Sequence, residues 1–329
     1  MAVRLLVVSD RLPPAARSGA GSVLLELVER LSSRHSVQRL TLPAAGGALA
    51  RSQAEIAVRR ALGGNPDAVI TLGPSVTASV PVFRILDGAH ADRASGAGLM
   101  GGLRRRVRVA RARTAVAIIP TEPSRPLLGA GPGARVLPPG VDVERFAPAS
   151  SRESGPTRIL FLGRLVPTRG AHAALEAVLG LPRWALDSVQ LEIAGAAEDA
   201  EYLAGLRRRA GEVPVRFVPD PTDVLPLLQR ADLALLPSTA EDGWGRAILE
   251  AMACGVPVVH SRGGVLDVIA GGAGIGVAAG NLKPLGERLR ELLRAPRELP
   301  ALGAAGRAHV LANHAWDVVL PAWEAALGG

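Results

Sequence analysis

Short apolar runs alternate with amphipathic segments along the chain, and this alternation predicts the strands and helices of an α/β protein. In the first half, buried strands are predicted by the apolar runs at residues 3–8, 38–42, 67–72, 82–86 and 115–119. Helices are predicted between them over residues 22–33 and 51–62. Strands this apolar belong in a parallel sheet with helices on both faces.

The second half of the chain repeats this alternation. Strands are predicted at residues 158–162, 189–194, 215–220, 231–236 and 258–259, and helices at 223–229 and 248–253. Between the two halves, Pro148–Pro156 is rich in serine and proline, and we place the hinge there. A length of 329 residues corresponds to about two domains, so each half is expected to fold around its own sheet.

One stretch, Pro237–Val259, combines these elements with polar residues suited to ligand binding. The pattern predicts the end of a strand, a loop with two glycines around Trp244, a helix closed by Gly255, and another strand. Asp242 lies in the loop and Glu250 in the helix. Open α/β sheets bind ligands at the carboxyl ends of their strands. There, helix amides suit phosphate oxygens and a carboxylate accepts two sugar hydroxyls, so we expect a ligand site here.

The same stretch resembles the signature of the retaining GT-B glycosyltransferases of family 4, the glycosyl transferases group 1. Members carry Glu-x7-Glu within a Pro-Ser…Glu-Gly-Phe-Gly…Glu-Ala-Met-Ala-x-Gly-x-Pro-Val-Val frame. Here Asp242-x7-Glu250 occupies that frame, with Trp244 in the aromatic position. The first acid is therefore Asp242, or Glu241 if the loop shifts. The resemblance is close over about residues 135–280 and looser before them.

Other motifs of the family fit as well. Gly163 and Arg164 match its Gly-Arg-Leu turn, and Arg169 stands where a lysine is usual. In the family, the arginine and the lysine at these positions hold the nucleotide diphosphate. Arginine keeps the positive charge and offers a two-pronged fork for phosphate oxygens. Gly19 stands in the family's glycine pair against the donor diphosphate. His90 is the candidate for a histidine facing the cleft between domains; the alternative is a loop histidine without a role.

The resemblance therefore implies a complete set of site residues. Catalytic roles fall on Arg164, Arg169, Asp242 and His90, and donor binding falls on Gly19, Gly163, Gly243, Trp244, Gly245 and Glu250. Glu250 would hold the ribose hydroxyls. Asp242 and the amides of the following two residues would hold hydroxyls of the donor sugar. No cluster of His, Cys and Asp has metal-ligand spacing, so no metal and no cofactor are expected.

The implied fold is GT-B, in which two Rossmann-like, doubly wound parallel-sheet domains face a cleft. Residues 1–147 would bind the acceptor, 148–310 the nucleotide sugar, and 311–329 would form a C-terminal helix that crosses back. The implied activity is metal-independent hexosyl transfer, with retention, from a UDP or GDP sugar to a hydroxyl of a small-molecule or lipid-linked acceptor. Its setting would be natural-product or cell-envelope glycoconjugate biosynthesis. Two alternatives stay open: a GT-B nucleotide-sugar epimerase, and a non-catalytic nucleotide-sugar-binding partner of a glycosyltransferase.

Charge is distributed unevenly along the chain. Residues 1–150 hold 20 arginines against 10 acidic residues, whereas residues 151–329 hold 18 basic and 20 acidic residues. A helix predicted over 101–113 includes the run Arg104–Arg113, which would contact an anionic membrane surface if its arginines shared one side. Their spacing does not gather them on one stripe, which favours a solvated face. Without aromatic residues between the basic ones, no nucleic-acid partner is expected.

The single cysteine, Cys254, lies at the apolar end of the helix predicted over 248–253. We interpret it as a buried structural thiol rather than a nucleophile. A chain without a disulfide suits a reducing compartment. We find no signal peptide and no apolar run of about 18 residues, so the expected location is the cytoplasm.

Overall fold

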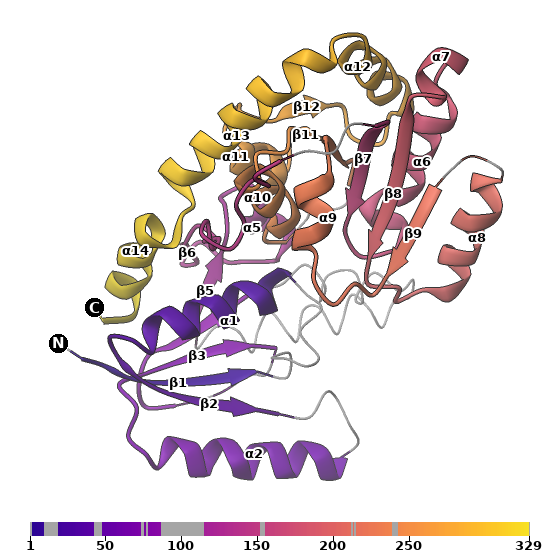
Figure 1. Ribbon diagram of the computed structural model, residues 1–329. Coiled ribbons are helices and arrows are strands. Elements are labelled where there is room, and N and C mark those ends of the chain that lie inside the picture. Colours follow the sequence, from indigo (N-terminus) through magenta and orange to yellow (C-terminus); the bar gives the residue numbers. More distant parts are fainter. Residues whose placement is uncertain are drawn as a thin grey trace. The chain divides into compact units, whose positions relative to one another are not determined.

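The computed structural model describes residues 2–9, 19–42, 48–73, 76, 78–86, 115–151, 155–211, 213, 215–238 and 243–328. The chain folds into two compact units. Unit 1 consists of Met1–Gly140 and Asp317–Gly329, and unit 2 consists of Val141–Trp316 (Figure 1). None of the helices in the described part of the chain is both long and apolar enough to cross a membrane.

Unit 1 is built on a six-stranded, all-parallel sheet with the order β2-β1-β3-β4-β5-β6. Its strands are β1 (Arg4–Ser9), β2 (Ser36–Thr41), β3 (Ala68–Leu72), β4 (Val82–Ile85), β5 (Val116–Ile119) and β6 (Arg135–Val136). Helices α1 (Gly19–Leu31) and α2 (Ala48–Leu62) cover opposite faces of this sheet (Figure 1). Leu6 and Val8 pack with Ala61 of α2, as expected for alternate positions of a strand covered on both sides.

The first helix begins earlier than the sequence pattern predicts. We expected it to start at Ser22, but α1 includes Gly19, Ala20 and Gly21 in its first turn. Ala20 and Gly21 are buried, and their small size lets this turn pack closely. The prediction placed them in a loop because glycines are read as loop residues when no packing partner is known.

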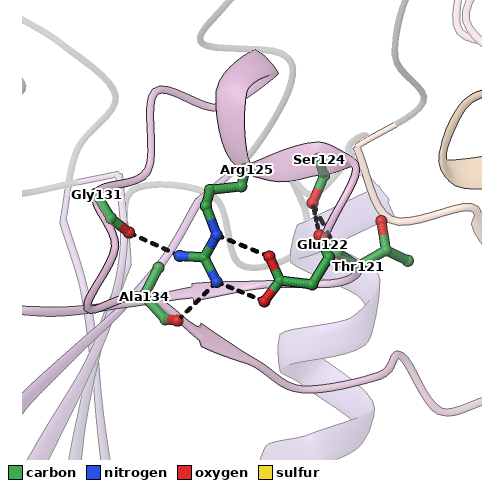
Figure 2. Close-up of polar contacts among 6 residues, drawn as sticks. All are labelled: Thr121, Glu122, Ser124, Arg125, Gly131 and Ala134. Atoms are coloured by element: carbon green, nitrogen blue, oxygen red, sulfur yellow. Dashed lines mark hydrogen bonds and ion pairs between the residues drawn. The ribbon is translucent and has the colours of Figure 1, made fainter.

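The turn after β5 is held by one arginine (Figure 2). The Arg125 guanidinium donates to both carboxylate oxygens of Glu122 at 2.7 and 2.6 Å. It also donates to the main-chain oxygens of Gly131 and Ala134 at 2.7 and 3.2 Å. Within the same turn, Ser124 Oγ donates to Thr121 O at 2.6 Å. These contacts order the connection that carries α5 (Ser124–Leu127) between β5 and β6.

The last helix, α14 (Trp316–Gly328), packs on unit 1 for nearly all of its length. Trp323 is fully buried, and its Nε1 donates to Pro138 O at 3.0 Å. Arg135 Nη1 donates to Ala326 O at 2.9 Å, and Arg34 forms an ion pair with Glu324 at 3.2 Å. The buried tryptophan supplies the apolar area, and the polar contacts around it fix the helix in place.

Unit 2 is built on a second six-stranded, all-parallel sheet with the order β12-β11-β10-β7-β8-β9. Its strands are β7 (Thr157–Leu162), β8 (Val189–Gly195), β9 (Val215–Pro219), β10 (Leu233–Leu236), β11 (Val258–Ser261) and β12 (Ile275–Val277). The chain winds from β7 to β9 in one direction, then returns to β10 beside β7 and continues the other way. This is the doubly wound Rossmann order, with its switch point between β7 and β10.

Helices bury both faces of the second sheet. Its helices are α6 (Ala171–Leu179), α7 (Arg183–Leu186), α8 (Ala200–Ala210), α9 (Leu225–Arg230), α10 (Arg246–Ala253), α11 (Val265–Ala270), α12 (Leu282–Arg294) and α13 (Leu299–Asn313). In β7, Ile159 and Phe161 pack in a core with α6, α8 and α12. The alternate residues Leu160 and Leu162 pack in a second core with α9, α10 and α11. Period-two alternation along one strand therefore supplies both layers.

The segment after Gly140 is part of unit 2. Val141 N donates to His314 O at 2.9 Å, and Phe146, which is 1% exposed, belongs to the core that contains α10. The serine- and proline-rich segment at which we placed the hinge therefore lies inside unit 2, after these anchors.

Candidate functional site

The carboxyl edge of the second sheet brings together most of the described residues to which the sequence analysis gave a donor-site role. At the switch point, Gly163 and Arg164 directly follow β7, and Pro237 and Ser238 directly follow β10. Doubly wound sheets bind ligands at this place because the loops on either side of it diverge. The candidate site therefore lies at the position that the sheet topology predicts for a ligand.

Two glycines bring the loop after β7 and the end of β8 into backbone contact. Gly195 has φ +147°, and a Cβ atom there would lie 1.7 Å from Gly163 O. Gly163 N donates to Ala194 O at 3.0 Å, and Leu165 N donates to Ala196 O at 2.7 Å. The turn that carries Arg164 is thus tied to the neighbouring loop without any intervening side chain.

Arg164 is held at this edge by a carboxylate from the loop after β8. Its guanidinium lies 3.3 Å from Glu198, and its side chain is 13% exposed. An arginine that is mostly buried at the end of a parallel strand presents its charge to the edge of the sheet, where a phosphate would bind.

Arg169 is brought to the same edge by a close backbone contact. It ends a short 3-10 helix, η2 (Pro167–Arg169), and is 8% exposed. The next residue, Gly170, has φ +81°, and a Cβ there would lie 2.2 Å from Pro237 O. Ser238 Oγ donates to Thr168 O at 3.2 Å. The turn before α6 therefore lies directly against the end of β10, so Arg169 is next to the switch point.

The start of α10 is packed tightly into unit 2. Gly243, Trp244 and Gly245 are all buried, and Trp244 is 1% exposed. Gly245 has φ +59°, and a Cβ there would lie 2.4 Å from Ile269 Cδ1 of α11. The Trp244 ring is a packing group, so the donor-binding role predicted for this residue concerns only its main-chain amide.

Glu250 is buried on α10 and paired with an arginine that sequence reasoning missed. Arg246 Nη2 lies 2.6 Å from Glu250 Oε1, and both residues are 8% exposed. The two residues are four positions apart on the helix, which is the spacing at which side chains meet. That spacing was visible in the sequence, but the same spacing is common in surface pairs and does not indicate burial.

The remaining predicted residues fall elsewhere. Gly19 is in the first turn of α1, in unit 1. Asp242, its alternative Glu241, and His90 lie outside the described residues, as does Arg104–Arg113. Among the residues that the structure describes, no group of three or more His, Cys, Asp or Glu side chains is arranged to hold a metal ion.

The thiol of Cys254 follows α10 and is 1% exposed. Burial, and next the nearby Glu250 charge, raise the pKa of this thiol to about 12. We therefore expect native protein not to react with a thiol reagent at about pH 8, because almost no thiolate is present. The raised pKa contributes stability below the ordinary thiol pKa and loses it as the pH rises toward about 12. Labelling followed with and without denaturant checks this; rapid labelling of the native protein would contradict a buried structural thiol.

Comparison with known proteins agrees with this architecture. Residues 156–295 match the family model described as glycosyl transferases group 1. A relative from Corynebacterium glutamicum is 34% identical over 213 residues. It is the GDP-mannose-dependent monoacylated alpha-(1-6)-phosphatidylinositol monomannoside mannosyltransferase. The matched residues cover 58% of this chain and 55% of the relative. Glycogen synthase of Mycobacterium tuberculosis is also 34% identical, over 201 residues that cover 58% of this chain and 48% of the relative.

The curated relatives are longer than the part they share with this protein, since the matching region spans about half of their length. Solved structures match along nearly the whole chain. Anabaena HepE in complex with UDP and glucose aligns with a TM-score of 0.79 and 18% identity, over 99% of both chains. Sucrose-phosphate synthase from Thermosynechococcus elongatus aligns with a TM-score of 0.82 and 18% identity, over 98% of both chains. Residues 156–295 are therefore similar to the glycosyl transferases group 1, and the chain has the GT-B fold of two Rossmann-like units.

Proposed function

We propose that the protein transfers a glycosyl group from a nucleotide diphosphate sugar to an acceptor hydroxyl, with retention of the anomeric configuration. The observation that carries the proposal is the edge of the second sheet. Two arginines that are mostly buried, Arg164 and Arg169, come from separate parts of one βα connection and lie at the switch point between β7 and β10. A buried carboxylate, Glu250, lies on the helix that follows β10.

These residues suit the chemistry of a departing nucleoside diphosphate. When the bond between the sugar and the diphosphate breaks, negative charge grows on the phosphate oxygens. Guanidinium groups already fixed at the edge of the sheet stabilise that charge more strongly in the transition state than in the ground state, which is what accelerates the reaction. Arg164 and Arg169 would thereby do the work of a divalent cation, so the proposal does not require a metal.

The bond changes in the proposed reaction balance without a protein nucleophile. The bond from the anomeric carbon to the phosphate oxygen breaks, and the acceptor oxygen forms its new bond on the same face of the sugar. The proton of the acceptor hydroxyl passes to the departing phosphate oxygen. Glu250 would accept hydrogen bonds from the donor ribose, and Asp242 and His90 would contact the sugar or the acceptor.

The choice of donor and acceptor draws on the relatives. The Corynebacterium relative is named for its dependence on GDP-mannose, and the HepE structure contains UDP and glucose. We therefore propose a UDP or GDP sugar as donor. The acceptor is a hydroxyl compound of natural-product or cell-envelope biosynthesis, since the same relative acts on a phosphatidylinositol mannoside by its name.

A nucleotide screen tests the donor site directly. The melting temperature of the purified protein would be measured with UDP, GDP, ADP and TDP, each with magnesium and with a chelator. We expect one nucleotide to raise it and the chelator to leave the rise unchanged, because a ligand of the native state stabilises it by mass action. At a concentration of about 100 times Kd the stabilisation is about 2.7 kcal/mol. No rise with any nucleotide, in a protein that melts cooperatively, would overturn the proposal.

A second measurement separates an enzyme from a non-catalytic nucleotide-sugar-binding partner. The purified protein would be incubated with the sugar form of the nucleotide that it binds, and release of free nucleoside diphosphate would be followed over time. We expect slow hydrolysis without acceptor, since the same arginines stabilise the leaving group when water replaces the acceptor. Binding without any release of diphosphate would favour the non-catalytic partner.

A further inference from the structure

Helix α10 contains an ion pair that is unusually well shielded from water. Arg246 Nη2 and Glu250 Oε1 lie 2.6 Å apart, and the two side chains are 9% and 11% exposed. Most ion pairs along a helix are exposed and contribute little stability. A pair this buried loses the hydration of both charges, so a well-packed apolar pair of similar size would stabilise the helix about as well. Stability alone therefore does not account for these two residues.

The guanidinium of Arg246 also lies close to an aromatic ring. The Arg246 guanidinium carbon lies 5.9 Å from the centre of the Phe146 ring, a cation–π distance, and Phe146 is 1% exposed. The main chain of Phe146 is fixed in turn, since its N donates to Asp142 O at 2.8 Å and its O accepts from Arg307 Nη1 at 3.2 Å. Arg246 thus contacts both the ring and the carboxylate, and these two contacts restrict the orientation of its guanidinium.

We propose that Arg246 is a positioning residue that orients the Glu250 carboxylate for the ribose hydroxyls of the donor nucleotide. The proposal rests on the donor site proposed above. A carboxylate that accepts from two neighbouring hydroxyls needs both of its oxygens turned toward the sugar. A guanidinium at 2.6 Å from Oε1 restricts rotation of the carboxylate and keeps the buried charge compensated while the ribose is bound. Arg246 touches neither the sugar nor the phosphates in this scheme.

The experiment uses nucleotides that differ only in the ribose. Calorimetry would measure Kd for UDP or GDP, whichever the wild type binds, and for its 2′,3′-dideoxy analogue. The ratio of the two Kd values reports the contribution of the ribose hydroxyls. Variants would be Arg246→Met, Arg246→Lys, Glu250→Gln and the double variant Arg246→Met with Glu250→Gln. Arg307→Met is the matched control, because Arg307 also contacts Phe146 O and the end of α10, at Ala253 O, but does not pair with Glu250.

We expect the wild type to prefer the ribonucleotide by at least about tenfold, the effect of hydrogen bonds to a charged group. Arg246→Met and Glu250→Gln should each bring the ratio of the two Kd values close to one. The double variant should lower the preference no further, because the two residues act as a unit. Arg246→Lys should restore part of the preference, since it keeps the charge but not the fork. Arg307→Met should lower the melting temperature and leave the ratio unchanged.

The outcomes separate this inference from the proposed function. If the wild type binds a nucleotide and Arg246→Met keeps the wild-type ratio, the positioning role is overturned and the donor site stands. If Arg307→Met loses the preference to the same extent, the effect is one of general packing around Phe146, and the role assigned to Arg246 is likewise wrong. If the wild type binds no nucleotide, both proposals fail.

Discussion

Replacing Arg164 with alanine is expected to lower kcat by about 100- to 1000-fold, with unit 2 still folded. The guanidinium lies at the carboxyl end of β7, where growing charge on the departing diphosphate would need compensation in the proposed reaction. Its benefit belongs to the transition state, so kcat and kcat/KM should fall together while the donor KM changes less. Steady-state kinetics, with a sugar of the nucleotide that the screen identifies as donor and an acceptor that the wild type turns over, would check this.

Two matched variants make the result interpretable. Glu198→Gln removes an ion-pair partner of Arg164 but leaves the guanidinium, so its effect on kcat should be much smaller. Arg183→Ala removes an exposed arginine of α7 that pairs with Asp187, and it should leave both kcat and the melting temperature unchanged. Near-normal turnover of Arg164→Ala would show that the leaving group is stabilised elsewhere.

Gly195→Ala is expected to destabilise unit 2 by at least about 3 kcal/mol, the combined effect of strained backbone and overpacking. The residue has φ +147°, which only glycine adopts readily, and its Cβ would lie 1.7 Å from Gly163 O. Gly195 ends β8 and Gly163 directly follows β7, so moving the two glycines apart would break the hydrogen bond from Gly163 N to Ala194 O. Chemical denaturation of the wild type and of Gly195→Ala would measure the change in the free energy of unfolding.

Gly286→Ala is the control for that experiment. Gly286 lies within α12, and nothing lies within 4 Å of the Cβ that alanine would add there. Alanine is a better helix former than glycine, so this variant should gain about 0.5 to 1 kcal/mol. If Gly195→Ala unfolded at the wild-type denaturant midpoint, Gly195 would not lie in close backbone contact with Gly163.

Several site residues were predictable because they stand in a local pattern. The turn with Gly163 and Arg164 follows a buried strand, and Glu250 follows a glycine-containing loop in a recognisable frame. A pattern of this kind specifies the element and its end, and the carboxyl end of a parallel strand is where the ligand binds. Arg246 was missed because four-residue spacing is present in exposed and buried helices alike. Its burial depends on Phe146, which lies a hundred residues earlier in the chain.

Some boundaries of helices and strands could likewise be predicted from the sequence, whereas others depend on tertiary contacts. Strands predicted from apolar runs agree with β1, β3, β4 and β8 to within one or two residues, because burial on both faces requires the runs themselves. The start of α1 at Gly19 did not follow from local preference, since glycine disfavours helix in the absence of tertiary contacts. Likewise, the end of unit 1 depends on the pairing of Val141 with His314, a contact between distant residues that composition does not report.

The sequence alone predicted the type of fold and the candidate residues for binding a nucleotide diphosphate. Hydrophobic periodicity is a local property, so it specified strands, helices and their alternation, and the motif around Glu250 indicated the donor site. Only the tertiary structure decided the strand order that places β7 beside β10, the backbone contact of Gly170 with Pro237, and the pairing of Glu250 with Arg246 against Phe146. Those features depend on packing between residues far apart in the chain, where the gain from burial and close contact overrides local preference.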